Sequence, residues 1–330
     1  MITDLSQENI LRLVSRWVPN QDQKKIKIHT DTTDFFRVEY NDLLMLGKKL
    51  YLIRHNAKEG RFGLDDEVKY WVKRAVDLED GTLKIIKLVF YEKFVTKIGK
   101  IEFECFRSPK KEARILELVA DYKNFMHGYS IKDIKENTVR VLDFVYGKTL
   151  AAFIEDINLD HQTYFHNQFP EILDNFIKCV EGISFLHKNG EKHGDIRRDH
   201  IIVERESGIY RWIDYDYNYR HRENIYGYDL FGLGNILIFL AGKGDMLLSA
   251  LQKSNKPVFE KLYDEDLNIV FNNRVGNLKK IYPYIPESLN RIFILFHIHK
   301  ERGESLMINQ KRLVENFMDL IKINSVSREE

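Results

Sequence analysis

The sequence is poor in cysteine: Cys105 and Cys179 are the two cysteines among its 330 residues. Two cysteines cannot build the disulfide framework of a small secreted domain. Neither lies in a Cys-X-X-Cys pair or beside the histidine pair that structural zinc sites use. We therefore expect two free thiols in a reducing compartment, and a cytoplasmic protein.

Long hydrophobic runs are also missing. The longest is "LFGLGNILIFLAG", residues 230–242, and it contains Asn235. Such a run is too short to span a bilayer and predicts a buried helix. The first residues, "MITDLSQENILRLVSRWV", have no basic start followed by an apolar core, so we expect no signal peptide. We expect no membrane partner.

Neither sign of charge is in excess, because 51 lysines and arginines face 50 aspartates and glutamates. The net charge of +1 gives no global attraction to nucleic acid or to an anionic membrane. An RNA-binding function has only local groups of Arg and Lys in its favour, and salt-dependent binding would test it. A nucleic-acid partner is therefore not expected. A hydrophobic content of 44% supports a sizeable core in one large domain or two lobes.

The first part of the chain has the pattern of a sheet. After an amphipathic helix expected over residues 1–20, β-branched and aromatic residues dominate from about 26 to 105. The stretches are "FFRVEY", "KKLYLIRHN", "VKYWVKRAVDL" and "TLKIIKLVFYEKF". Glu79-Asp80-Gly81 predicts a hairpin turn between the last two. Ser108 and Pro109 then supply the cap and first residue of one helix.

The second part has helical periodicity. The helical stretches are "EILDNFIKCVEGISFLH", "YDLFGLGNILIFLAG", "PESLNRIFILFHIHK" and "QKRLVENFMDLIKI". With a boundary near residue 148, the patterns predict an α+β protein. We expect an N-terminal extension, residues 1–50, with a helix and strands packed on a β-rich part, 51–148. A helical part, 149–330, follows.

Charge gathers in one short segment, "EKHGDIRRDHIIV", residues 191–203, between a long helix and a β-branched run. Asp195 lies in the loop after the long helix, where its carboxylate could accept a hydrogen bond from a reacting hydroxyl. Downstream, "WIDYD" places Asp214 at a strand end, where it could bind a divalent cation. The structural alternative for both aspartates is that they cap turns.

These stretches and the "YDLFGLGNILIFLAG" helix, in this order and spacing, resemble the protein-kinase-like superfamily. The resemblance covers about residues 55–320 and is strongest over 171–242. The His-Gly-Asp triplet resembles atypical Ser/Thr kinases of the bacterial type. The resemblance implies a bilobal fold with a small antiparallel β-rich N-lobe and a larger helical C-lobe. It also implies that ATP is bound with Mg²⁺ or Mn²⁺.

The resemblance implies roles around the charged segment. Asp195 would be the catalytic carboxylate and Asp214 a metal ligand. Arg197 stands where Ser/Thr kinases usually carry a lysine that contacts the phosphate, and its guanidinium fork can do the same. His200 stands at the metal-binding asparagine. It would be a second ligand that favours Mn²⁺, or it would only pack beside the strand. Arg198 alternates with Arg197 and is expected on the surface.

Lys87, within "KIIKLVF", is expected to contact the phosphates of ATP. Ile85 lies on the same strand face and would cover the adenine. Glu112 shares the inward face of the helix after Ser108, and we expect it to pair with Lys87. Lys84 is expected on the opposite face of the strand, in solvent.

Two further segments would bind the nucleotide if the resemblance holds. "KEGRFG" resembles the end of a glycine-rich loop, where Gly60, Phe62 and Gly63 would lie against the phosphates. Lys58 stands where the family has its first glycine. The segment 143–147 would be the hinge, and the backbone of Asp143 and Val145 would bind adenine.

The sequence does not identify the acceptor of the phosphate. Gly194 replaces the arginine with which regulated protein kinases bind a phosphorylated segment, and only 14 residues separate Asp214 from Asp229. The Ala-Pro-Glu signature is missing. We expect an ATP-dependent phosphotransferase that acts on a hydroxyl of an unidentified protein or small molecule. A Ser/Thr-type protein kinase with a short activation segment is favoured. The alternatives are a small-molecule kinase of the aminoglycoside phosphotransferase type and, because of His200, a catalytically weak nucleotide-binding pseudokinase scaffold.

Overall fold

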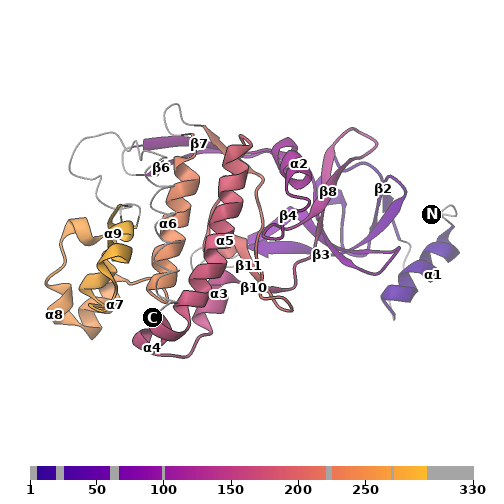
Figure 1. Cartoon of the computed structure of the whole chain (residues 1–330). Helices are drawn as coiled ribbons and strands as arrows, with labels where there is room; N and C mark the ends of the chain where they lie inside the picture. Colours follow the sequence, from indigo (N-terminus) through magenta and orange to yellow (C-terminus); the bar gives the residue numbers. More distant parts are fainter. Residues whose placement is uncertain are drawn as a thin grey trace. The chain divides into compact units, whose positions relative to one another are not determined.

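The computed structural model describes residues 6–19, 26–59, 67–98, 101–220, 225–268 and 271–295. The chain is a mixed α+β protein with two compact units (Figure 1). The first unit comprises residues 1–92, 107–122 and 126–145, and the second comprises 93–106, 123–125 and 146–330. A curled sheet dominates the first unit, and helices dominate the second.

The sheet of the first unit has seven strands in the order β1-β2-β3-β4-β5-β9-β8. These are Ile28–His29, Leu43–Leu46, Lys49–Glu59, Glu67–Asp77, Leu83–Lys87, Thr138–Asp143 and Gly128–Lys132, in that spatial order. Every neighbouring pair is antiparallel except β1 and β2, which run parallel. The expectation of an antiparallel sheet is therefore wrong at this edge. The long connection over 30–42 lets the chain return and run in the same direction.

One expected strand is absent from the described residues. Within "FFRVEY", residues Phe35–Arg37 form a short 3₁₀ helix, η1. The side chain of Asp34 accepts a hydrogen bond from the amide of Phe36 at 3.1 Å. Local capping of this kind competes with extended backbone and here outweighs the β propensity of the phenylalanines.

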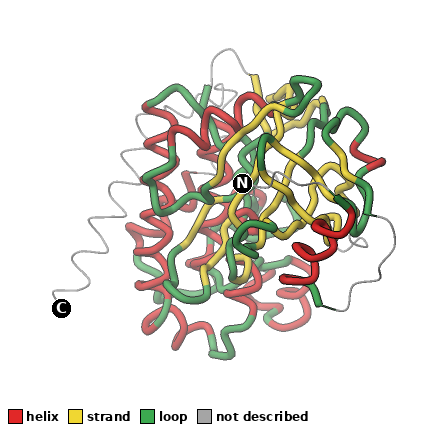
Figure 2. Tube along the Cα trace, turned by 90° about the vertical axis from the view of Figure 1, so that its right-hand side faces the viewer, coloured by secondary structure: helices red, strands yellow, loops and turns green. Residues whose placement is uncertain are grey.

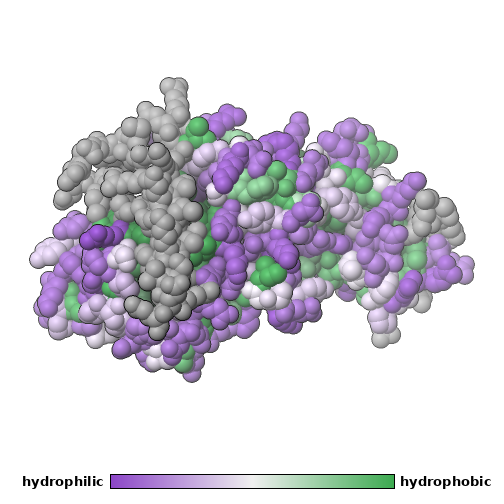
Figure 3. Space-filling model, viewed as in Figure 1, coloured by the Kyte–Doolittle hydropathy of each residue, from purple (hydrophilic) through white to green (hydrophobic). Residues whose placement is uncertain are grey.

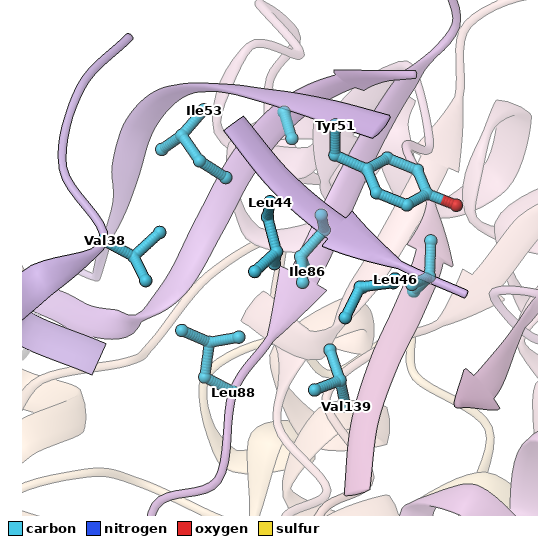
Figure 4. Packing of buried hydrophobic residues seen from close by; sticks show 10 residues of the cluster. Val38, Leu44, Leu46, Tyr51, Ile53, Ile86, Leu88 and Val139 are labelled. Carbon is cyan, nitrogen blue, oxygen red and sulfur yellow. The ribbon is translucent and has the colours of Figure 1, made fainter. Parts of the chain in front are cut away.

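Alternation along β5 decides where its side chains go. Ile86 and Leu88 are fully buried in a cluster with apolar residues of β2, β3 and β9 (Figure 4). The other members of the cluster are Val38, Leu44, Leu46, Tyr51, Ile53, Ala75, Val139 and Val141. Because strand neighbours point to opposite faces, this core turns Lys87 and Ile85 to the other side of the sheet.

The N-terminal extension belongs to the first unit. Helix α1, Gln7–Trp17, begins after the capping side chain of Ser6, as its amphipathic pattern predicts. Ile10 and Val14 are buried in a second cluster, with residues of β2, β3 and β4. The predicted turn at 79–81 is formed, and Gly81 has a φ of +77°. A Cβ on Gly81 would lie 2.3 Å from the ring of Trp17, so this turn requires glycine.

Helix α2, Pro109–Leu118, starts where the sequence predicts. Ser108 caps it by accepting a hydrogen bond from the amide of Lys111, and Pro109 occupies its first turn. Ile115 and Leu116 are buried, and the helix packs on β8 and β9. This packing places the first turn of α2 against the Lys87 face of the sheet.

The second unit is built around α5, Phe169–Lys188, and α6, Gly227–Ala241, which lie side by side (Figure 1). Its other helices are α3 Leu150–Glu155, α4 His161–Asn167, α7 Leu248–Ser254, α8 Lys256–Phe259 and α9 Glu287–Leu295. Most residues of α6 are buried, which explains the apolar run at 230–242. The helix expected over 310–323 lies outside the described residues.

Two small sheets complete the second unit, with their strands yellow in Figure 2. One contains β10 Gly147–Thr149, β11 Ile201–Glu204 and β12 Tyr210–Trp212. The other contains β6 Lys93–Ile98, β7 Ile101–Arg107 and β13 Tyr217–Arg220, in the order β13-β7-β6. The β6–β7 hairpin was not expected, although its two alternating runs and the intervening glycine are a hairpin signal.

The surface drawn in Figure 3 is mainly hydrophilic, with small apolar patches between polar side chains. Within the part of the chain that the structure describes, no helix combines the length and the apolar character that crossing a membrane would need.

Candidate functional site

Lys87 and Glu112 come together in the first unit. The ammonium of Lys87 lies 2.8 Å from Oε1 of Glu112, and the two side chains are 5% and 0% exposed. A buried ammonium needs a counter-charge and hydrogen-bond acceptors, and the first turn of α2 supplies both. The structure thus makes the pair that the helix and strand patterns indicate.

Arg140 on β9 is a third member of this group, which no sequence pattern indicated. Its Nε lies 3.1 Å from Oε2 of Glu112, and its side chain is 2% exposed. Its Nη1 donates to the carbonyl oxygens of Leu88, at 3.3 Å, and Thr138, at 2.9 Å. The available signal was an arginine at an alternate position of a strongly apolar strand, "TVRVLD", where a charge needs a partner.

The register of the sheet shows which side chains share the face of Lys87. Val72 and Arg140 lie opposite Lys87, and Leu142 lies opposite Ile85. Directly paired residues point to the same face, so Val72 joins Ile85 on it, which the sequence did not indicate. Lys84 lies on the opposite face, as expected, but its ammonium binds Oδ1 of Asp143 at 2.7 Å and its side chain is only 18% exposed.

In the expected hinge, residues 143–147, the backbone of Val145 is available for a ligand. The amide of Asp143 donates to the carbonyl oxygen of His127 at 2.9 Å, so the sheet already uses it. Among the described residues no backbone hydrogen bond of Val145 is found. Gly60, Phe62 and Gly63 lie outside the described residues, and Lys58 just before them is exposed.

In the second unit, Asp229 at the start of α6 fixes the backbone before Asp195. Its carboxylate accepts the amide hydrogens of His193 and Gly194, each at 2.8 Å, and lies 3.0 Å from Nε2 of His187. Burial alone would raise the pKa of Asp229, but the hydrogen bond and charge of His187 and the Gly194 amide keep it below its usual value. The carboxylate therefore stays ionised and anchors the loop.

Gly194 is required by its surroundings. Its φ is +88°, a conformation that favours glycine, and an ideal Cβ would lie 1.9 Å from the carbonyl oxygen of Tyr217. The arginine of regulated protein kinases therefore has no room here. Strand β13, to which Tyr217 belongs, occupies the space.

His200 links the two other charged residues of the loop. Its Nδ1 lies 2.7 Å from the carbonyl oxygen of Asp195, and its Nε2 lies 2.6 Å from Nη2 of Arg197. A carbonyl only accepts and a guanidinium only donates, so in these two contacts Nδ1 is the donor and Nε2 is the acceptor. Arg197 also faces the Asp195 carboxylate, with Nε 3.4 Å from Oδ1. Asp195, Arg197 and His200 thus form one group.

Asp214 completes the group from the strand-end turn. Its Oδ2 lies 3.6 Å from Nε2 of His200, and its φ is +61°, an uncommon value for aspartate. Two ligands about 2.1 Å from one ion can stand this far apart. The described residues contain no cluster of three or more ligating side chains, so an ion here would need phosphate or water oxygens as well. Such a donor set fits a phosphate-bound Mg²⁺ or Mn²⁺.

Arg198 is not the surface residue that alternation predicts. Its Nη2 lies 2.9 Å from Oδ2 of Asp245, and the guanidinium lies over the ring of Phe239 at 4.1 Å. Asp245 also binds Arg274 through its other oxygen, at 3.0 Å. Arg198 therefore ties the charged loop to the segment that follows α6.

The segment after Asp214 is packed inward. Tyr215, Tyr217 and Tyr219 are all buried, and β13 pairs with β7 of the hairpin. Tyr219 packs with Phe103 and Cys105 of β7, among other residues, and its carbonyl oxygen accepts from Lys192 at 3.0 Å. The hairpin therefore provides a surface on which this segment is held.

Comparisons with known proteins agree with the kinase resemblance over part of the chain. No protein-family model matches it. The chain is 23% identical over 144 residues to MAP kinase kinase kinase SSK2 of Saccharomyces cerevisiae, which is 44% of this chain and 8% of that protein. It is 24% identical over 144 residues to Serine/threonine-protein kinase SSK22 of the same yeast, covering 44% and 10%.

It is also 28% identical over 104 residues to Serine/threonine-protein kinase chk1 of Schizosaccharomyces pombe, which is 31% of this chain and 19% of that protein. The matched segments thus span less than a fifth of the length of each of these relatives. The likeness is distant and partial. It indicates a relationship to the kinase-like superfamily in general, and no subtype.

Proposed function

We propose that this chain is an ATP-dependent phosphotransferase with a bilobal protein-kinase-like fold, which transfers the γ-phosphate to a hydroxyl, as a Ser/Thr-type protein kinase does. The observation that carries the proposal is the buried pair of Lys87 and Glu112. Burying a charged lysine costs free energy, and binding the phosphates of a nucleotide would explain why the chain places one here. The distant likeness to Ser/Thr kinases supports the same class.

The roles follow from the chemistry of each group. Lys87 would bind phosphate oxygens, Ile85 would cover the adenine, and the backbone of Val145, which the sheet does not use, would bind the edge of the adenine. Gly60, Phe62 and Gly63 remain expected contacts for the phosphates. Asp195 would accept the proton of the attacking hydroxyl, and Arg197 would bind the transferred phosphate.

Asp214 and His200 would hold the divalent ion, which when bound neutralises phosphate charge. At present Nε2 of His200 accepts a hydrogen bond from Arg197. To bind a metal, His200 would have to release Arg197, and this release would leave the guanidinium available to the phosphate. The two proposed roles are therefore compatible with each other.

The test is transfer of phosphate from ATP by wild type and by Asp195→Asn. The carboxylate orients the acceptor and scarcely touches the nucleotide, so we expect loss of about 10²–10⁴-fold in transfer. Nucleotide binding should stay within a few-fold. Asp199→Asn is a matched control, because Asp199 is exposed and lies four residues away. Equal transfer by wild type and Asp195→Asn would refute the assignment.

The acceptor can be assigned in the same experiment. The segment after Asp214 is short and its tyrosines 215, 217 and 219 are buried, so it offers little surface on which an extended peptide could bind. A small-molecule acceptor is therefore the second candidate. Protein substrates carrying Ser and Thr, and aminoglycosides, would be offered in parallel. ATP binding without metal-dependent transfer to any acceptor would favour a nucleotide-binding scaffold. A cytoplasmic location belongs to this proposal, supported by two cysteines that are buried and free.

A further inference from the structure

Arg140 is a buried cation for which the proposed catalytic roles give no use. The residue is 1% exposed and lies on β9, directly opposite Lys87 in the register of the sheet. Both cations contact the same carboxylate, each through a different oxygen: Lys87 takes Oε1 of Glu112 and Arg140 takes Oε2. Glu112 is thus shared between two strands.

We propose that Arg140 is a positioning residue that keeps Glu112 beside Lys87 whether or not a nucleotide is bound. The clamp itself is a property of the first unit. Only its consequence for ATP rests on the proposed function. In this arrangement the first turn of α2 needs no ligand to reach its place.

The geometry restricts the carboxylate in two ways. Glu112 cannot rotate away from Lys87 without also leaving Arg140, because its two oxygens are engaged separately. The guanidinium is planar and rigid, and its Nη1 is fixed by carbonyl oxygens of Leu88 and Thr138. The position of Arg140 is therefore set by the sheet backbone.

Moving α2 outward would be unfavourable. Withdrawal of Glu112 would remove one buried contact from each of two buried cations, Lys87 and Arg140. Breaking a buried ion pair costs much more than breaking an exposed one, because the desolvated charge is left behind. A single Lys–Glu pair would leave one such charge, whereas this group leaves two.

The test is hydrogen–deuterium exchange of residues 109–118 in the full chain without nucleotide and with Mg-ATP. In wild type, we expect slow exchange that ATP scarcely changes. In Arg140→Met, we expect exchange in α2 to be faster by about tenfold or more without ATP, and to slow again when ATP is added. A merely structural role for Arg140 would not make the protection of α2 depend on nucleotide.

Lys73→Met is a matched control. Lys73 is a cation of the same sheet and is also 1% exposed, and its ammonium binds the Val38 carbonyl and the Asn56 side chain. It pairs with Ile86 and so points to the face opposite Lys87. We expect Lys73→Met to leave α2 protected. Equal loosening of α2 in Lys73→Met and Arg140→Met would overturn the proposal, as would unchanged protection in Arg140→Met.

A second variant covers the case in which Arg140→Met fails to fold. Arg140→Lys keeps the charge but loses the fork that binds Glu112 and the carbonyls together, and we expect intermediate exchange. Wild-type protection in Arg140→Lys would then overturn the proposal. If the wild type does not bind ATP, the proposed function fails. The difference in exchange between nucleotide-free wild type and the Arg140 variant still decides whether the clamp exists.

Discussion

Charged side chains are held differently in the two units. In the first, Glu112 is fully buried and its oxygens bind cations at 2.8 and 3.1 Å. In the second, Asp195 and Asp214 are 17% and 12% exposed, and they face Arg197 and His200 at 3.4 and 3.6 Å. We call Lys87, Glu112 and Arg140 the closed group, because water scarcely reaches them. We call Asp195, Arg197, His200 and Asp214 the open group, because both of its carboxylates keep some access to water.

The difference follows from burial. A charge without access to water must find its partners within the protein, and it then loses the freedom to change them. A partly exposed carboxylate can exchange a protein contact for one to a ligand at small cost. The closed group suits a fixed binding element, and the open group suits residues that meet a reacting phosphate and hydroxyl.

The largest effect is expected from removing Lys87, the cation of the closed group that would contact the phosphates. We expect Lys87→Met to lower transfer from ATP by about 100-fold, the scale of losing one preorganised contact to developing charge. Glu112→Ala should have a smaller effect, because Lys87 itself remains. Steady-state transfer at several ATP concentrations measures both. Lys84→Met is the control, and damage from it alone would show that Lys87 is not the phosphate-binding lysine.

Lys73 shows what burial does to a cation whose hydrogen bonds go to neutral oxygens. Burial lowers the pKa of Lys73 to about 8 from its usual 10.5. Between these values the unfolded chain keeps a proton that the folded chain has lost, so stability should rise with pH across this window. The rise should reach about 3 kcal/mol at most.

Urea unfolding at several pH values from 7.5 to 10.5 measures this effect. In Lys73→Met we expect the rise in the free energy of unfolding to disappear. Lys132→Met is the matched control, because Lys132 also binds two neutral oxygens but is exposed. An identical pH dependence in wild type and Lys73→Met would show that the buried ammonium keeps its ordinary pKa.

A test of the open group is its choice of metal. An imidazole nitrogen favours Mn²⁺ over Mg²⁺, whereas an amide oxygen suits Mg²⁺. We therefore expect wild type to transfer phosphate a few-fold faster with Mn²⁺, and His200→Asn to shift the preference toward Mg²⁺. Transfer rates of both proteins with each metal decide it. An unchanged preference would leave His200 with the single role of holding Arg197.

The smallest effect is expected from dephosphorylation. Gly194 leaves no arginine to bind a phosphorylated segment, and Tyr215, Tyr217 and Tyr219 are buried. Phosphatase treatment should therefore leave transfer unchanged relative to a mock-treated sample. Loss of activity that rephosphorylation of a tyrosine in 215–228 restores would contradict this and show that the open group is under external control.

Elements with strong local signals could be predicted from the sequence. Helix α2 begins at Ser108 and Pro109, the turn at Gly81 is formed, and the apolar run at 230–242 is a buried helix. Capping, positive φ and hydrophobic periodicity act over a few residues, so they can be read from neighbours in the chain. Strand alternation also predicts the face of the sheet on which Lys87 lies, and helix periodicity predicts that Glu112 faces inward.

Contacts between distant segments depended on the tertiary structure. Arg140 is an unusual residue in an apolar strand, but only the packing of α2 on β9 gives it Glu112 as a partner. Gly194 is a glycine because β13 passes within 1.9 Å of the place of a Cβ. The alternation that placed Lys87 correctly failed for Arg198, since Asp245 comes from a segment that no local pattern connects to it. The sequence determined the periodic faces and the capped ends, because their causes are local. The closed and open charge groups were decided by burial and by the meeting of remote segments, which only the folded chain provides.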